Sequence, residues 1–278
     1  MTTTRSAIEP TSPRRLGSGG SARRRVLALA AAETRLLLRN RTAVMSSVLL
    51  PRAMVAAVGA ITVSNGGRVD GPGLLASALG VTLTFVTFYN LVTTFVARRE
   101  ELVLQRMRTG ELTDAEVLLG TAVPTLLVTA VQVVLVAVGV VVLGEWSAPV
   151  DIVLPLVALL GGGALMVALA AVSTSFTRTV EAAQFTTMPL VLTATLLSGL
   201  LIPLSDFPEQ LASVARFLPL TPVIELSRLG LAGQTWDGQL VDTAGAWAAS
   251  PLPLAVLACW VVGGVVLARL VFRWAPRR

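Results

Sequence analysis

The sequence contains no histidine, and all of its basic residues are arginine because it also lacks lysine. Without lysine the chain cannot form a phosphate-binding Walker A motif or a Schiff base. Without histidine it cannot build a Ser-His-Asp triad or a histidine metal site. The single cysteine, Cys259, excludes a disulfide within the chain, and its simplest interpretation is a small buried hydrophobic residue. The common forms of P-loop and hydrolase chemistry are therefore excluded.

Charge is scarce as well. Only 14% of the residues are charged and 54% are hydrophobic, whereas soluble proteins have about a quarter charged residues. A membrane-spanning helix needs about 20 apolar residues. The sequence predicts an all-α membrane protein with six such helices, at residues 42–63, 74–96, 117–143, 152–176, 186–204 and 252–272. Nucleic acid is not an expected partner, because the net charge of +6 is segregated along the chain.

The segregation of arginine predicts the orientation. Arginines are concentrated before the first predicted span, between the second and third, after the fourth and at the C-terminus. The other loops hold only Arg68, Arg216 and Arg228 among many acidic residues. By the positive-inside rule, both termini are cytoplasmic. We expect a disordered tail at residues 1–22, an amphipathic interfacial helix at 23–41 and a six-span domain at 42–278.

A charged hairpin joins the second and third predicted spans. It is expected to end one helix near Gly110 and to begin the next with a capping box, Thr113-x-x-Glu116. Helices that leave the membrane and return on its cytoplasmic side present a surface that a soluble partner can bind. The candidate partner-binding residues are Arg98, Arg99, Glu100, Glu101, Leu102, Leu104 and Arg108.

Two sets of polar residues lie within predicted spans. Thr84, Thr87 and Asn90 share one face of the second span, where they either line a translocation path or pack against another helix. We favour packing, since threonine and asparagine are common between membrane helices. Arg52 lies inside the first span. It is either functional or extends its charge to the headgroups, and the sequence does not decide between these interpretations.

The stretch 198–233 is too apolar for an ordinary loop and too interrupted for a span. Asp206-x-x-Glu209 is expected to cap a short helix that Pro219 and Pro222 end, followed by a second helix at 223–231. The two helices either re-enter the membrane under cover of neighbouring spans or rest on the outer headgroups. Arg216 and Glu225 are expected to form an exposed pair. The candidate outer-gate residues are Asp206, Leu211, Val214 and Leu218.

The basic N-terminal helix, the hairpin RREELVLQRMRTGELTDAEVLLG and the block SGLLIPLSDFPEQLASVARFLPLTPVIELSRLGLAG carry a resemblance to a known family. From about Arg23 onward the chain resembles the permease subunit of type-2 ABC exporters, in particular the daunorubicin-type drug-resistance branch. Arg52 departs from the pattern, since an apolar residue is expected there.

The resemblance implies an exporter of a hydrophobic or amphipathic compound in the bacterial plasma membrane. It implies a dimer, with the second permease most simply an identical copy, and two ATP-binding subunits. This chain would bind no cofactor, and ATP and Mg would be held by the partner subunits. Residues 98–110 would be the coupling helix, residues 23–41 the connecting helix and 206–229 the re-entrant helices.

The alternative is a stand-alone membrane protein. A proton-driven carrier usually has carboxylates or histidines within its spans, and the predicted spans have neither. An intramembrane hydrolase needs a base beside its nucleophile, and the chain has no histidine for this role. Neither alternative accounts for the charged hairpin.

Overall fold

The computed structural model describes residues 24, 27–32, 34, 35, 56, 60, 70–101 and 113–272. These residues are almost entirely helical and form no β-strand, which confirms the all-α class. Five helical segments in this part of the chain are long and apolar enough to cross a membrane. They are Gly71–Glu100, Ala115–Val142, Val153–Phe176, Val180–Leu197 and Pro251–Val271. The predicted first span lies outside the described residues except for positions 56 and 60.

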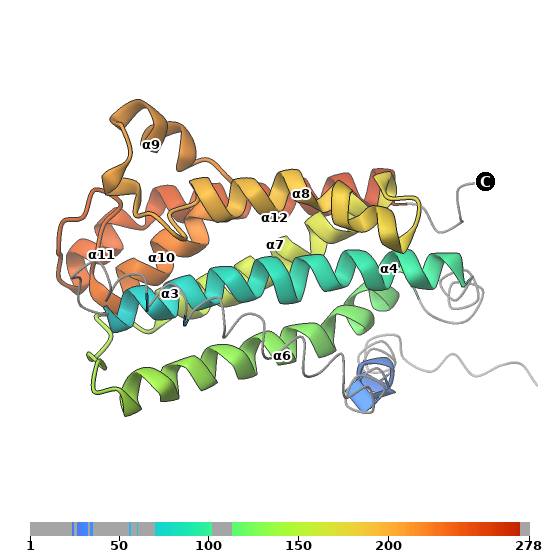
Figure 1. Cartoon of the computed structure of the whole chain (residues 1–278), viewed down its shortest axis with the longest axis horizontal. Coiled ribbons are helices and arrows are strands. Elements are labelled where there is room, and N and C mark those ends of the chain that lie inside the picture. The colour runs from blue at the N-terminus through green and yellow to red at the C-terminus, as the bar shows by residue number, and fades with distance from the viewer. Residues whose placement is uncertain are drawn as a thin grey trace, which may run out of the picture.

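The long helices lie side by side along one axis (Figure 1). The first of these described helices, which corresponds to the second predicted span, runs without a break through α3 (Gly71–Val81), the π-helix η1 (Thr82–Tyr89) and α4 (Asn90–Glu100). It is followed by α6 (Asp114–Val142), α7 (Val153–Phe176), α8 (Val180–Leu197) and α12 (Pro251–Val271). We call the end of the bundle where α4 and α7 finish the Arg99 end, and the opposite end the α9 end.

The α3–η1–α4 helix is the central element of the described bundle. In its most apolar stretch 83% of the residues are buried, against 17% in α6 and in α12. The helix contacts α6, α7, α8 and α10, so its apolar side chains meet protein on most sides. The apolar surfaces of α6 and α12 are left facing outward, and Cys259 on α12 is exposed rather than buried as expected.

Local signals position the ends of the spans. The predicted capping box of α6 is confirmed, because Thr113 N donates to Glu116 Oε2 (2.6 Å) and Glu116 N donates to Thr113 Oγ1 (3.4 Å). The fifth span was misplaced: α8 begins at Val180, where Thr179 Oγ1 accepts a bond from Ala182 N, and it ends at Leu197. Gly199, with φ of +79°, turns the chain soon after that end.

Four short helices connect α8 to α12 at the α9 end: η2 (Leu204–Asp206), α9 (Glu209–Ala215), α10 (Thr221–Ala232) and α11 (Thr243–Ala249). α10 lies inside the bundle and packs against α3, α7 and α12. Its Gly230 is so close to Pro155 and to the backbone of Asp151 that a Cβ would clash there. In contrast, α9 stands away from the long helices (Figure 1).

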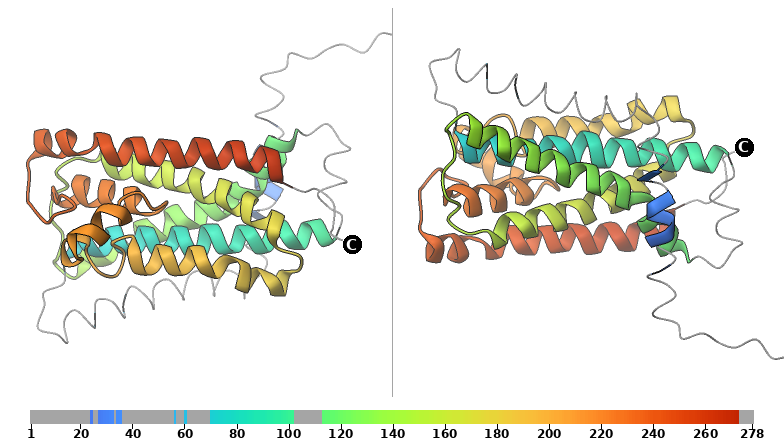
Figure 2. Two further views of the ribbon diagram at one scale, coloured as in Figure 1. Left: turned by 90° about the horizontal axis from the view of Figure 1, so that it is seen from above. Right: turned by 90° about the horizontal axis from the view of Figure 1, so that it is seen from below.

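The described part of the N-terminal region is helical at residues 24, 27–32, 34 and 35. It lies beside the bundle at the Arg99 end, close to the start of α6 (Figure 2). Leu29 packs so closely on Gly120 of α6 that a Cβ at that glycine would meet its side chain. Whether this helix rests on a membrane surface stays a prediction.

Candidate functional site

The Arg99 end of the bundle is organised around one buried arginine. The side chain of Arg99 is fully buried. Its Nη1 donates to the carbonyl oxygen of Thr174 (2.8 Å), and its Nη2 donates to the carbonyl oxygens of Thr177 and of Arg178 (3.4 Å for the latter). These carbonyls belong to the last turn of α7 and the turn that follows it, where helix carbonyls have no partner within the helix. Arg99 therefore joins the end of α4 to the end of α7.

The other described coupling candidates point in different directions. Arg98 Nη1 donates to Thr121 Oγ1 of α6 (3.2 Å), whereas Glu100 and Glu101 are exposed. Leu102, Leu104 and Arg108 lie outside the described residues. Arg99 was expected to present an exposed charge, and this was wrong, because the α7 carbonyls take up its guanidinium inside the bundle. Among the described residues of this set, the exposed charges are the carboxylates of Glu100 and Glu101.

The polar face of the second span is largely a packing surface. Thr84 and Thr87 are fully buried, while Asn90 is half-buried. Thr84 Oγ1 donates to the carbonyl of Gly80 (2.9 Å), and Thr87 Oγ1 lies 2.7 Å from Thr129 Oγ1 of α6. The burial of both threonines and the contact between Thr87 and α6 support the packing interpretation. A role in a translocation path stays a prediction.

A second polar contact between η1 and α6 was not anticipated. Thr82 Oγ1 donates to Gln132 Oε1 (3.3 Å), with both side chains buried. With the Thr87–Thr129 pair it forms a short polar seam along this interface. Gln132 is a polar residue within a long apolar run, and that was the signal available in the sequence.

The outer-gate candidates divide between two surroundings. Leu211 and Val214 on α9 are exposed (42% and 66%), while the buried side of that helix consists of Ala212 and Ala215. Leu218 instead turns inward and lines a cavity. Asp206 ends η2 and does not cap α9: the N-cap of α9 is Pro208, and no side chain bonds the first turn. Pro222 lies in the first turn of α10 and does not end α9.

The pair formed by Arg216 and Glu225 is present, but it is not exposed as expected. Arg216 Nε lies 3.1 Å from Glu225 Oε1, with 18% and 6% of the two side chains exposed. The guanidinium also lies over the Trp236 ring, 4.6 Å from its centre, a cation–π arrangement. Burial raises the pKa of Glu225, and the charge and hydrogen bond of Arg216 oppose this rise. α10 buries the pair because it lies inside the bundle.

A second arginine at the α9 end, Arg228 of α10, contacts the loop after α8. Its Nη2 donates to the carbonyl of Gly199 (2.9 Å). Burial lowers the pKa of Arg228, while the carboxylates of Asp70 and Asp206 act to raise it. In the sequence, Arg228 was notable only because few arginines lie on the predicted exterior side of the membrane.

A cavity of about 240 Å³ lies between α7, α8 and the connection from α9 to α10. Its wall is almost entirely apolar, and Thr193 is the one polar side chain in it. The lining residues are Met166, Pro189, Leu190, Thr193, Ala194, Leu218, Pro219 and Leu220. Such a cavity suits an apolar ligand or part of one.

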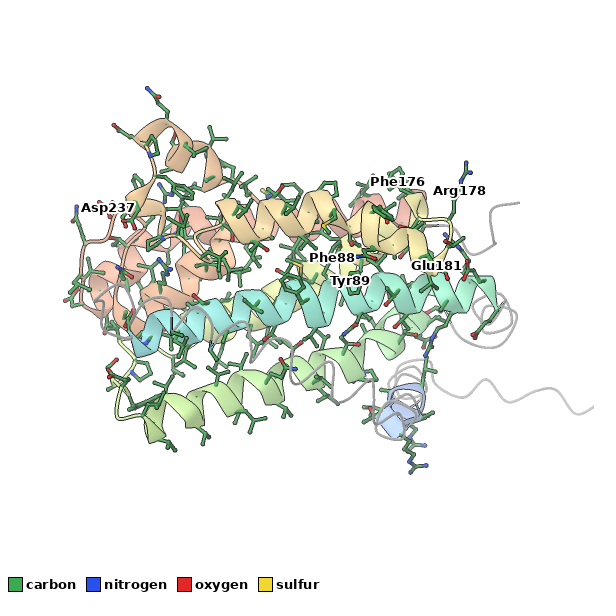
Figure 3. The ribbon with its side chains drawn as sticks, in the orientation of Figure 1. Phe88, Tyr89, Phe176, Arg178, Glu181 and Asp237 are labelled. Carbon is green, nitrogen blue, oxygen red and sulfur yellow. The ribbon has the colours of Figure 1, made fainter. Side chains whose placement is uncertain are left out.

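Figure 3 shows the two ends together, with Phe176, Arg178 and Glu181 at the Arg99 end and Asp237 at the α9 end. Phe88 and Tyr89 lie midway, where η1 passes through the bundle. Among the described residues, no group of three or more His, Cys, Asp or Glu side chains is placed to hold a metal ion.

Long apolar helices, a buried central span and charged ends define a multi-pass α-helical membrane protein. A family model described as ABC-2 type transporter matches residues 24–231. The chain therefore belongs to the ABC-2 type transporter family, and it is the permease component of such a transporter rather than an enzyme. Comparison with curated proteins gives no match.

Proposed function

We propose that the chain is the permease of an ATP-driven exporter in a bacterial plasma membrane, with both termini in the cytoplasm. Two ATP-binding subunits bind at the Arg99 end, and a second, identical permease completes the pathway. The ABC-2 family match carries this proposal. The absence of lysine supports it, because ATP and Mg must then be bound by another polypeptide.

The ATP-binding subunit meets the Arg99 end through the exposed carboxylates Glu100 and Glu101 and the hairpin that follows them. Arg98 and Arg99 act within the permease, since both bond neighbouring helices. Electrostatic recognition therefore requires a basic surface on the partner.

The exported compound is hydrophobic or amphipathic, as in the daunorubicin-type branch of the family. The apolar cavity beside Thr193 supports this substrate class. Filling the cavity with Thr193→Trp should change which compounds are exported while ATP hydrolysis continues, since the ATP sites lie on other chains.

The exit is closed by the α9 helices of the two permeases. The exposed apolar side chains of Leu211, Val214 and Phe217 support contact with a second copy, because they have little cover within this chain. A disulfide between two Val214→Cys chains should stop export, and reduction should restore it. Crosslinked protein that exports at the reduced rate would contradict this gate.

The decisive test is co-purification of the tagged chain with an ATP-binding subunit from its own cells. The complex should hydrolyse ATP, and the double reversal Glu100→Arg and Glu101→Arg should uncouple hydrolysis from transport while membrane insertion continues. A double variant with normal ATPase binding and normal transport would remove this surface from the coupling role.

A further inference from the structure

We propose that Arg99 is a positioning residue that transmits movement of the ATPase-facing hairpin to α7, and through α7 to the α9 end. The proposal rests on the proposed coupling to an ATP-binding subunit. It assigns to this arginine an internal role, distinct from contact with the partner.

The first step is the set of hydrogen bonds by which Arg99 connects α4 to the end of α7. Arg99 is the next-to-last residue of α4, directly before the charged hairpin. Its guanidinium bonds the carbonyls of Thr174, Thr177 and Arg178 at the end of α7. The negative end of the α7 dipole also favours a cation at this place. A displacement of the end of α4 must therefore either move the end of α7 or break these bonds.

The second step is the length of α7. This helix has 24 residues, which corresponds to about 36 Å at 1.5 Å per residue. It packs extensively against α10 and α12. Its three central glycines, Gly161, Gly162 and Gly163, are each covered by side chains of neighbouring helices, which hold α7 along its length and oppose bending there. Movement at its last turn therefore reaches its first turn.

The third step is the attachment of α7 at the α9 end. Asp151 Oδ1 accepts bonds from Val153 N (2.7 Å) and Leu154 N (2.9 Å), and its Oδ2 accepts one from Trp247 Nε1 of α11 (3.0 Å). Asp151 N donates to the carbonyl of Gly230 in α10 (2.8 Å). The start of α7 is thus tied to both short helices that bracket the loop 233–242.

The chemistry of arginine explains why this residue performs the role. Its planar fork donates in fixed directions to several acceptors, whereas lysine has a single flexible ammonium group. Nη1 bonds the carbonyl of Thr174 within α7 and Nη2 bonds those of Thr177 and Arg178 after it, so the fork holds the helix and the following turn together. Arg99→Lys keeps the charge and loses this geometry.

The experiment uses the complete complex with its ATP-binding subunit in vesicles. A Cys259→Ala background carries Leu240→Cys as the reporter, since Leu240 is 77% exposed in the loop 233–242. The rate of modification by a water-soluble maleimide is measured with and without ATP plus vanadate. Arg99→Met should reduce the nucleotide-dependent change in this rate about fivefold or more, a common size for coupling between sites.

Arg178→Met is the matched control. It removes the same charge at the same end of the bundle, but the Arg178 side chain is exposed and only its carbonyl accepts from Arg99. The proposal requires that Arg178→Met keep the response and Arg99→Met lose it, while both bind the ATPase normally. Equal responses in both variants, whether retained or lost, would overturn the proposal.

Arg99→Lys covers the case in which Arg99→Met does not fold. It should fold and give an intermediate response, and a full wild-type response would overturn the role of the fork. Failure of the proposed function is distinguishable, because unsubstituted chain carrying the reporter would then bind no ATP-binding subunit. Failure of this inference alone leaves that complex intact and responsive.

Discussion

Arg99 at one end of the bundle and Arg216 at the other are both withdrawn from solvent, but their charges are neutralised differently. At the Arg99 end the guanidinium bonds three backbone carbonyls. At the α9 end Arg216 bonds the carboxylate of Glu225 and lies over Trp236. Carbonyls do not titrate, whereas a carboxylate does. The bonds of Arg99 therefore depend on geometry alone, while the pair of Arg216 and Glu225 also depends on pH.

The surroundings of the two arginines fit this difference. Arg99 lies on the most buried helix of the described chain, where a movable charge would be costly. Arg216 follows α9, which stands off the bundle, and part of its side chain meets solvent. The bonds of Arg99 therefore form a fixed connection between α4 and α7, whereas the ion pair between Arg216 and Glu225 can be broken.

Charge reversal at the Arg99 joint should have the largest effect. Arg99→Glu places a carboxylate against the carbonyls of Thr174 and Thr177 with no donor between them. An unpaired buried charge costs several kcal/mol, which we expect to abolish folding. The measure is the yield of monodisperse protein after detergent extraction. Arg178→Glu, at an exposed side chain, should keep a normal yield, and a normal yield for Arg99→Glu would refute the fixed joint.

The pair at the α9 end should show a smaller, pH-dependent effect. Glu225→Ala leaves Arg216 without its carboxylate and should cost about 2 kcal/mol, the range of a hydrogen bond to a charged group. Glu225→Gln keeps an acceptor for Arg216 and should cost less. Thermal unfolding in detergent measures both.

The pH dependence of this pair has a definite sign. The pKa of Glu225 in the folded protein lies above its ordinary value of 4.5, so protonation favours the folded state. This contribution is complete below 4.5 and is lost as the pH rises through the folded pKa. The stability of the wild-type protein relative to Glu225→Gln should therefore increase as the pH falls from neutral towards 4.5. If this stability difference instead decreases as the pH falls, the ion pair with Arg216 has a larger effect on the pKa of Glu225 than burial has.

The hydrogen bonds of Asp151 at the start of α7 should contribute less to stability than the pair of Arg216 and Glu225. Asp151→Ala removes the acceptor for Val153 N and Leu154 N at the start of α7, and loss of such a cap costs about 1 kcal/mol. These bonds lower the pKa of Asp151, first through Leu154, so the stabilisation is present above its ordinary value of 3.8 and is lost below it. Glu145→Ala, at an exposed residue of the same connection, is the control. Equal melting temperatures for the two variants at neutral pH would argue against the tie.

The sequence predicted the long helices well and the two joints poorly. A run of about 20 apolar residues identifies a span by its own composition, so five of the predicted spans appear with shifted ends. Arg98 and Arg99 cannot be distinguished in this way. They are adjacent and chemically identical, and their directions depend on α6 and on an α7 end that lies 75 residues along the chain from Arg99.

The same limit explains the errors at the α9 end. The helices α9 and α10 are both short and apolar, yet one is exposed and the other buried. The difference arises from packing with α3 and α7, where Gly230 allows close approach to Pro155. Local patterns do not encode that contact, so the depth of the Arg216–Glu225 pair was misjudged.

The smallest effect is expected midway between the two ends, at the polar seam. Thr87 Oγ1 and Thr129 Oγ1 lie 2.7 Å apart, and both side chains are fully buried. Hydrogen bonds between membrane helices are worth about 0.6 kcal/mol on average, because each hydroxyl finds another partner when the pair is broken. Thr129 already donates to the carbonyl of Thr125 (3.1 Å), which limits its loss.

A double-mutant cycle with Thr87→Val and Thr129→Val measures this coupling, since valine keeps the shape of threonine without its hydroxyl. We expect about 0.6 kcal/mol from thermal unfolding and unchanged export, because packing residues hold the helices rather than the substrate. Cysteines at Thr84 and Thr87 should also resist a water-soluble thiol reagent in every nucleotide state. Reaction of either cysteine, or altered export by the valine variants, would show that the seam lines a translocation path and is not only a packing contact.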